Sequence, residues 1–260
     1  MWAVSKPLTL WFVKHLFLVP PQRALTREDR VLLAEGARIE ITALDRKLVG
    51  WKWGEGPLVV LVHGWGENAA RYHRFIRPFV AAGYAVVAFD FPAHGESEGR
   101  FTNFLEFVKV LQTVIEHTGP PHAIIGYSMG GGAVVSMWKM FDEKTRMVLI
   151  SSLYEVNETL TGFFDKSGVN PKLGREIFNG LVEYYNAKIS LINPSEVAKH
   201  VRCEALVIHD EGDWTVPMEH AESLARAIPR ARLFRTVGLS HFLTLDSEEV
   251  LAETLAFIKK

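Results

Sequence analysis

The feature that most constrains this chain is a serine between a predicted strand and a predicted helix. An apolar run at residues 123–125 leads into Gly-Tyr-Ser-Met-Gly at residues 126–130, and small residues follow. Strand, sharp turn and helix in this order place Ser128 at the tip of the turn, with its hydroxyl at a helix N-terminus. We expect this strained turn to press Gly126 and Gly130 against each other, so that both must lack a side chain. Ser128 is therefore a candidate nucleophile.

Apolar runs of strand length alternate with helical periodicity along most of the chain. The runs typical of strands buried on both faces lie at residues 58–62, 84–89, 123–125, 147–150, 203–208 and 232–237. A hairpin is predicted at 38–53, and helices are predicted at 27–35, 69–82, 103–117, 130–141, 218–228 and 246–258. This order predicts an α/β fold, with a mostly parallel sheet that helices cover on both faces. Asp246 is predicted to cap the last helix.

The alternation stops between residues 153 and 200. This segment mixes aromatic residues with polar ones and has no run typical of a buried strand. A segment of about fifty residues is too long for an ordinary connection between a strand and a helix. We therefore expect a small helical cap at 153–200, inserted into a core formed by 37–152 and 201–260.

Residues 1–36 precede the predicted core, and their first part is apolar. Lys6 and Lys14 interrupt large apolar side chains between residues 1 and 19. The uninterrupted apolar stretch is too short to span a bilayer, and no small-residue cleavage site marks a signal peptide. We interpret 1–19 as an amphipathic helix that docks on the domain. The alternative is a helix that lies on a membrane surface, which would give peripheral membrane contact.

Composition excludes several classes of function. The chain is 48% hydrophobic and 23% charged, with a formal net charge of −1, which is typical of a globular protein. A nearly neutral chain without a long basic run argues against nucleic acid as a partner. No grouping of Cys and His has the spacing of a metal site, so we expect neither metal nor cofactor. Cys203, the one cysteine, is interpreted as a buried core thiol; without an internal disulfide or a signal peptide, the sequence favours the cytoplasm. The oligomeric state is not indicated.

A serine hydroxyl is a weak nucleophile and needs a neighbouring base. The chain has ten histidines, and His241 follows the last predicted strand. In an open parallel sheet, sites form beyond the carboxyl ends of the strands, where Ser128 also lies. His241 is therefore the predicted base, whereas His200 and His220 are predicted to be surface residues.

The base in turn needs an acid that orients it. The loop after the predicted strand at 203–208 offers Asp210 and Asp213. Asp210 ends the strand, where we expect it to brace the loop by accepting backbone N–H groups. Asp213 lies further along the loop and is the predicted acid. Asp210 is the first alternative, and Glu155 is the second.

With serine, acid and histidine in this order, the chain resembles the α/β-hydrolase fold superfamily. The matching motifs are His-Gly-Trp-Gly at 63–66, Asp-Phe-Pro-Ala-His-Gly-Glu-Ser at 90–97, the pentapeptide at 126–130, Asp213 with Val-Pro at 216–217, and His-Phe at 241–242. The resemblance runs from residue 37 to the carboxyl terminus, apart from the cap. Its motifs are most similar to bacterial esterases and to the serine-aminopeptidase-like or monoacylglycerol-lipase-like branch.

The resemblance carries several implications for this chain. It implies an eight-stranded sheet and an oxyanion hole made by the backbone N–H groups of Trp65 and Met129. His63 and Gly64 would shape the oxyanion loop and take no part in the chemistry. One departure is Ser240, which stands before the histidine where the family often has glycine, and which could alter how this loop packs.

These observations together predict an enzyme. We expect a serine hydrolase that cleaves carboxylic esters through Ser128, His241 and Asp213 and an acyl-enzyme intermediate. Aromatic residues in the cap indicate a small-molecule ester with an apolar acyl or alkyl part. An acyltransferase, a thioesterase or a serine peptidase on the same fold is the alternative within enzymes. A catalytically inactive binding or scaffold protein is the alternative outside them, because a fold alone does not imply activity.

Overall fold

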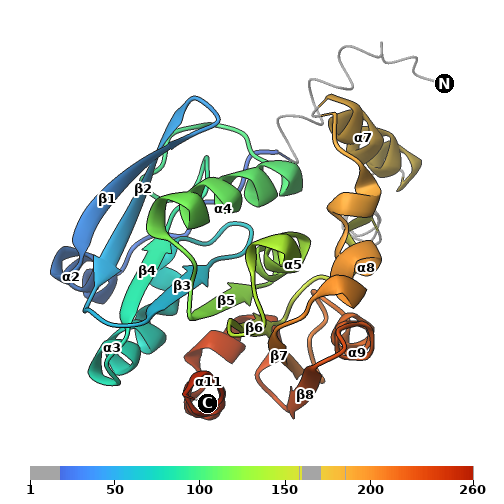
Figure 1. Ribbon diagram of the computed structural model, residues 1–260. Helices are drawn as coiled ribbons and strands as arrows, with labels where there is room; N and C mark the ends of the chain where they lie inside the picture. The colour runs from blue at the N-terminus through green and yellow to red at the C-terminus, as the bar shows by residue number, and fades with distance from the viewer. Residues whose placement is uncertain (1–17, 158, 160–170, 185, 260) are drawn as a thin grey trace.

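The computed structural model describes residues 18–157, 159, 171–184 and 186–259 (Figure 1). An eight-stranded sheet lies at its centre, in the order β1-β2-β4-β3-β5-β6-β7-β8. The strands are β1 (Ala37–Ala43), β2 (Arg46–Trp53), β3 (Leu58–Val62), β4 (Ala85–Phe89), β5 (Ala123–Tyr127), β6 (Arg146–Ile150), β7 (Glu204–Asp210) and β8 (Ala231–Thr236). β2 runs antiparallel to β1 and β4, and every pair from β4 to β8 is parallel. The predicted mostly parallel, eight-stranded sheet is thus confirmed, with one antiparallel strand making it mixed.

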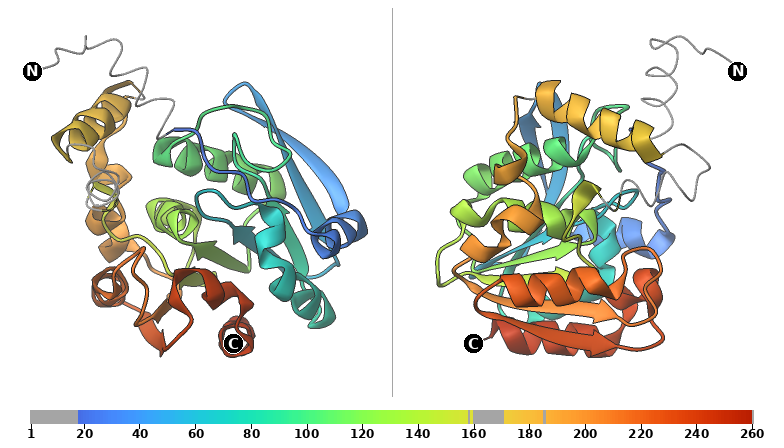
Figure 2. Two further views of the ribbon diagram at one scale, coloured as in Figure 1. Left: turned by 180° about the vertical axis from the view of Figure 1, so that it is seen from behind. Right: turned by 90° about the vertical axis from the view of Figure 1, so that its right-hand side faces the viewer.

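Helices cover both faces of this sheet, as the two views of Figure 2 show. The helices α4 (Phe104–Thr118), α5 (Met129–Ser136) and α9 (Met218–Ala227) pack on one face. The helices α2 (Arg27–Glu35), α3 (His73–Ala81) and α11 (Glu248–Ile258) pack on the other. Within β3, Val60 contributes to the first core and Leu61 to the second, which is why the strand is apolar at every position. Each such buried aliphatic side chain contributes roughly 1.5–3 kcal/mol to burial free energy.

The N-cap of the last helix lies one residue later than predicted. Ser247 is the N-cap of α11, and its side chain accepts a hydrogen bond from the Val250 N–H. The prediction of Asp246 as the cap is wrong. Asp246 ends a short 3-10 helix, η5 (Thr244–Asp246), and its carboxylate lies 3.1 Å from the guanidinium of Arg71.

The described part of the predicted cap is helical. It holds α7 (Pro171–Tyr184), η3 (Ile189–Leu191), α8 (Pro194–Val197) and η4 (Ala198–His200). α7 lies away from the sheet, beyond α8, in the view of Figure 1. The division of the chain into a core and a cap at 153–200 stays a prediction.

Two further predictions concern the amino-terminal segment and the cysteine. The amphipathic helix at 1–19 falls almost wholly outside the described residues, which begin at residue 18. Within the described ranges, no helix is both long and apolar enough to cross a bilayer. Cys203 is buried as predicted, at 1% exposure, and burial is the largest cause that raises the pKa of its thiol to about 11.

Candidate active site

Ser128 occupies a strained turn between β5 and α5. Its φ of 53° places a non-glycine residue in the left-handed region. The surrounding backbone fixes this conformation, since the Ser128 N–H donates to the Ile150 carbonyl on β6 at 3.0 Å. The Ser128 carbonyl accepts from the Gly132 N–H at 3.2 Å, which starts the helix. Strain of this kind is typical of functional sites and persists only where the neighbouring structure enforces it.

The two glycines of the pentapeptide are needed, but not for the predicted reason. A Cβ atom at position 126 would lie 2.5 Å from the Cα of Gly131, within α5. A Cβ atom at position 130 would lie 2.3 Å from the carbonyl oxygen of His63, at the end of β3. Gly126 and Gly130 are therefore not pressed against each other. They allow the helix to approach its own strand and the neighbouring strand.

The structure brings together Ser128, His241 and Asp213. His241 Nε2 lies 3.1 Å from Ser128 Oγ, and His241 Nδ1 lies 2.7 Å from Asp213 Oδ2. A carboxylate can only accept, so the Nδ1–H donates to Asp213 and leaves Nε2 able to accept the serine proton. His241 is 3% exposed and Asp213 is 5% exposed, so both groups meet away from bulk water.

Asp213 is held in place and kept ionised by its surroundings. Its Oδ1 accepts from the N–H groups of Thr215 at 2.9 Å and Val216 at 2.8 Å. Burial acts to raise the pKa of Asp213, but the hydrogen bond from His241, the electrostatic attraction to that ring and the Val216 N–H outweigh it. The net effect lowers the pKa of this carboxyl below its ordinary value. Asp213 therefore presents a fixed negative charge to His241.

The two alternative acids have other partners. Asp210 accepts hydrogen bonds from the N–H groups of Gly212, Leu239 and Ser240, as its predicted bracing role requires. Glu155 accepts from the amide of Asn193 at 2.7 Å and from the hydroxyl of Ser195 at 2.6 Å, with no bond to His241.

Ser240 departs from the family pattern, and the structure shows what the departure means. Its φ is 53°, in the left-handed region that favours glycine. Its N–H donates to Asp210 Oδ1 at 2.9 Å, which holds it in this conformation. The backbone before His241 thus keeps a glycine-like shape at a cost of about 1 kcal/mol.

The loop after β3 packs directly on Ser128. A Cβ atom at Gly64 would lie 2.9 Å from the Ser128 Cβ, so only backbone fits between them. Met129 is the first residue of α5, whose leading N–H groups have no partner within the helix. In the part of the chain that the structure describes, the N–H groups of Trp65 and Met129 make no hydrogen bond. Trp65 and Met129 thus lie on the loop and at the helix start that flank Ser128, and their role as oxyanion donors stays a prediction.

Two buried histidines shape this loop. His63 Nδ1 donates to the Gly64 carbonyl at 2.7 Å, and its Nε2 accepts from the Phe91 N–H. His94 Nε2 accepts from the Gly66 N–H at 3.0 Å, and its Nδ1 donates to the Pro92 carbonyl. Burial is the main cause that holds the pKa of His63 well below its ordinary value and lowers that of His94 to about 4. Both rings stay neutral, which lets each one donate and accept.

Comparison with known proteins now identifies the family. The family model described as serine aminopeptidase, S33, matches residues 56–184. A monoacylglycerol lipase from Mycolicibacterium smegmatis is 38% identical over 101 residues, which are 35% of this chain and 36% of that enzyme. The human monoglyceride lipase is 32% identical over 125 residues, 44% of this chain and 41% of that enzyme. The match thus spans less than half of either relative.

Solved structures share the fold over more of the chain. An esterase from Pyrococcus furiosus aligns with a TM-score of 0.70 over 94% of this chain and 97% of its own, at 24% identity. An esterase from Exiguobacterium antarcticum aligns with a TM-score of 0.68 over 86% of this chain and 100% of its own, at 18% identity. The chain belongs to the α/β-hydrolase superfamily. Within this superfamily, the matches favour the branch of the serine aminopeptidases and monoacylglycerol lipases.

Sequence reasoning on this α/β-hydrolase missed several residues near the site. The prediction that His220 is a surface residue is wrong, because it is 7% exposed and its Nδ1 accepts from the Tyr154 N–H at 2.9 Å. His94 belongs to the motif at 90–97, but the sequence gave no indication that its Nε2 would accept a hydrogen bond from the Gly66 N–H. Arg71 gave no signal, although it is one of the most buried charged residues described, at 5% exposure. His200 is exposed, as predicted.

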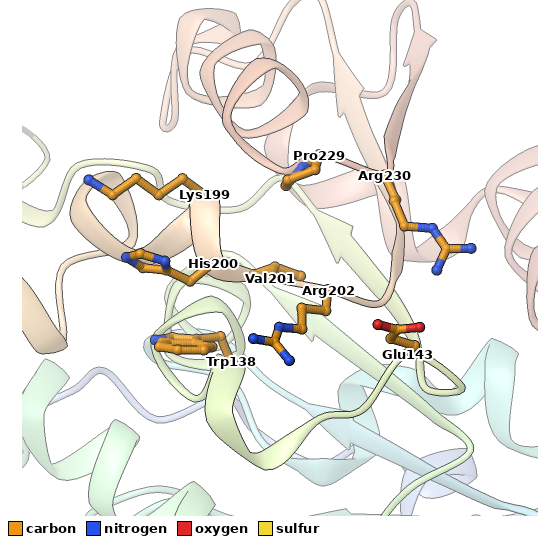
Figure 3. A pocket seen from close by; sticks show the side chains of 8 residues that line it. All are labelled: Trp138, Glu143, Lys199, His200, Val201, Arg202, Pro229 and Arg230. Carbon is orange, nitrogen blue, oxygen red and sulfur yellow. The ribbon is translucent and has the colours of Figure 1, made fainter.

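This α/β-hydrolase also has a hollow of about 520 Å³, and Figure 3 shows the side chains that line it. It is lined by Trp138, Glu143, Lys199, His200, Val201, Arg202, Pro229 and Arg230. The rings of Trp138 and His200 stack there at 5.1 Å. These residues precede β6, β7 and β8, whereas Ser128, Asp213 and His241 follow strands. The hollow therefore opens at the amino-terminal edge of the sheet, opposite the candidate site. Among the described residues, no group of three or more His, Cys, Asp and Glu could hold a metal ion.

Proposed function

We propose that this α/β-hydrolase is a serine hydrolase that cleaves carboxylic esters. The observation that carries the proposal is the continuous hydrogen-bonded line from Ser128 Oγ through His241 to Asp213, with distances of 3.1 Å and 2.7 Å. A nucleophile, a base and an orienting acid in this order are the parts that acyl transfer requires. No cofactor is needed for this reaction.

In the first half of the reaction, Ser128 Oγ attacks the carbonyl carbon of the ester. Its proton passes to His241 Nε2, and Asp213 stabilises the imidazolium that results. The carbonyl oxygen becomes an oxyanion, which the N–H groups of Trp65 and Met129 would stabilise. Loss of one such donor typically costs about 3–4 kcal/mol of transition-state stabilisation. As the C–O bond breaks, the alcohol leaves with the proton from His241, and the acyl group stays on Ser128.

In the second half, water replaces the alcohol. His241 takes a proton from the water as its oxygen attacks the acyl carbon, and the same two N–H groups meet the new oxyanion. The imidazolium then returns the proton to Ser128 Oγ as the acid leaves. The enzyme ends in its starting state, so one ester and one water give one acid and one alcohol.

We infer that the substrate is a small-molecule ester with an apolar acyl or alkyl part. Large apolar side chains adjoin the base and the acid: Phe242 follows His241 and Trp214 follows Asp213. They are 50% and 63% exposed, and their rings lie 6.4 Å apart. Exposed aromatic side chains beside the base and the acid favour apolar substrate groups over charged ones. The names of the relatives, a monoacylglycerol lipase and a monoglyceride lipase, agree with this substrate class.

The decisive test removes one oxygen atom. Ser128→Ala should lower kcat on p-nitrophenyl butyrate by at least about 10⁴-fold, since the covalent route is lost and only oxyanion stabilisation and binding remain. Ser223→Ala, on α9 and away from the site, makes the same change in a helix and should keep wild-type activity. Unchanged turnover in Ser128→Ala would refute the assignment.

A substrate panel separates this activity from its alternatives on the same fold. Esters of rising acyl length, one acyl thioester and one aminoacyl arylamide would be compared by kcat/KM. We expect the highest value for an ester and no measurable arylamide cleavage. A higher value for the thioester or the arylamide would indicate a thioesterase or a peptidase. Transfer of the acyl group to an added alcohol, faster than hydrolysis, would indicate an acyltransferase.

We infer a cytoplasmic location from the single cysteine, Cys203, which is buried and cannot form an internal disulfide. Fractionation of cells that express the full chain tests this. Recovery in a membrane pellet that high salt or carbonate releases would support peripheral contact through residues 1–19.

A further inference from the structure

We propose that Arg71 is a positioning residue that holds the His241 loop against Ser128. The inference rests on the proposed function, because it assigns Arg71 a part in keeping that base in reach of that nucleophile. Arg71 itself contacts neither the serine nor the imidazole in any hydrogen bond that the structure describes. It acts through the backbone that carries His241.

The guanidinium of Arg71 binds the segment just after the base. One nitrogen donates to the backbone carbonyl of Phe242, the residue that follows His241. Two nitrogens reach both carboxylate oxygens of Asp246, at 3.1 and 3.2 Å. This fork spans 242–246 and ties the turn to η1 (Ala69–Tyr72), which follows the oxyanion loop. A bidentate contact of this kind fixes direction as well as distance.

Tyr127, the residue before the nucleophile, contacts both the His241 loop and Arg71. Tyr127, the residue before Ser128, donates its hydroxyl to the His241 carbonyl at 3.0 Å. The guanidinium of Arg71 lies 5.8 Å from the centre of the Tyr127 ring. Arg71 therefore supports both the residue before the nucleophile and the residue after the base. The separation of Ser128 Oγ and His241 Nε2 depends on these two supports.

The oxyanion loop also contacts this arginine. Glu67 follows that loop, and its carboxylate lies 3.6 Å from Arg71 Nε and 3.4 Å from Arg23 Nε. Arg71 is 5% exposed, so its loss would leave a buried carbonyl and a mostly buried Glu67 carboxylate short of a partner. Because Glu67 after the oxyanion loop, Tyr127 before the nucleophile and Phe242 after the base all contact Arg71, its removal should shift these segments relative to one another while the domain stays folded.

A small displacement of the base is enough to slow the reaction. A shift of about 1 Å in a reacting group costs on the order of 10²-fold in rate. Arg71→Met should therefore lower kcat by about 10- to 100-fold, with KM within about 3-fold of wild type. Arg71→Lys keeps the buried charge and one donor nitrogen, but not the two-nitrogen fork, and should recover part of the loss. Arg77→Met is the matched control, because Arg77 pairs with Glu35 on the surface, away from the site.

Activity per folded molecule distinguishes positioning from a structural role. Each variant would be titrated to completion with a fluorophosphonate, so that kcat is expressed per reactive Ser128, and the rate constant of labelling would be measured separately. We expect Arg71→Met and Arg71→Lys to reach one label per folded chain, at slower rates than Arg77→Met. If Arg71→Met is recovered unfolded, Arg71→Lys decides the question.

The outcomes separate this inference from the proposed function. Wild-type kcat per labelled serine in Arg71→Lys and Arg71→Met, or a loss that falls wholly on KM, would overturn the positioning role and leave the hydrolase assignment intact. A wild-type chain that neither labels nor cleaves esters would instead refute the proposed function. A lower kcat with one label per chain and an unchanged KM would support the role of Arg71.

Discussion

Replacement of Asp213 by asparagine should reverse the hydrogen bonding of the base. Asp213 Oδ1 accepts from two backbone N–H groups, those of Thr215 and Val216, so an amide at this position must keep its oxygen there. The amide nitrogen of Asp213→Asn would then stand where Oδ2 is, 2.7 Å from His241 Nδ1. Because an amide NH₂ can only donate, Nδ1 would have to accept, and the imidazole proton would move to Nε2. That nitrogen could no longer accept the proton of Ser128.

The size of this effect follows from the chemistry. The wrong tautomer in a serine–histidine–aspartate arrangement lowers kcat by about 10⁴-fold, or about 5 kcal/mol of activation free energy. The two side chains are nearly the same size, so the fold should be retained. The stability change should stay near that of one charged hydrogen bond, about 1.5–3 kcal/mol. The loss in kcat should thus greatly exceed what unfolding explains.

The assay compares kcat on p-nitrophenyl butyrate at a temperature where each variant is folded by circular dichroism. Glu155→Gln is the matched control, since Glu155 bonds to Asn193 and Ser195 and has no bond to His241. It should retain kcat within about 5-fold of wild type, as expected for a residue outside the reacting groups. A kcat for Asp213→Asn within tenfold of wild type would refute the tautomer argument and reopen the choice of acid.

Two further predictions concern the supports of the site. Burial lowers the pKa of His94 to about 4, so the unfolded chain gains a proton before the folded chain as pH falls through about 6.5. Stability is lost between about pH 6.5 and about pH 4, and His94→Gln should reduce the fall in urea unfolding free energy between pH 7.5 and 4.5 by about 2.5 kcal/mol. An equal fall in both proteins would contradict this. Gly130→Ala should destabilise the chain by about 3 kcal/mol or more, because its Cβ meets the His63 carbonyl oxygen at 2.3 Å. The matched control is Gly180→Ala on α7, where an added Cβ atom would meet no described atom within 4 Å outside its own helix. This variant should be neutral or stabilising, and urea unfolding would measure both changes.

The parts that sequence patterns predicted well are those that local rules determine. The helix at Arg27–Glu35 was predicted to the residue, and in the structure Thr26 caps it and accepts from the Asp29 N–H. The strands buried on both faces appear as continuous apolar runs, and the turn at Ser128 follows from the glycines that flank it. Asp210 was correctly predicted to brace its loop, because a carboxylate at a strand end commonly accepts nearby N–H groups.

The parts that sequence patterns missed depend on contacts between distant residues. Asp246 looks like a helix cap, but Arg71, far away in the sequence, binds its carboxylate and leaves Ser247 to cap the helix. His220 was predicted to be exposed, but the loop after β6 places the Tyr154 N–H against it. Gly126 and Gly130 were assigned a shared contact, although each one faces a different neighbour. Such pairings become visible only once the strands are ordered in the sheet.

The most direct test of the central claim is the identity of the residue that a fluorophosphonate labels. Intact mass should show one adduct on the wild-type chain, and peptide mapping should place it on Ser128, because among the described residues only this serine has a histidine nitrogen within hydrogen-bond distance of its hydroxyl, at 3.1 Å. Ser128→Ala should remain unlabelled under the same conditions. No adduct on the folded wild-type chain, or an adduct on a different serine, would contradict the assignment of Ser128 as the nucleophile.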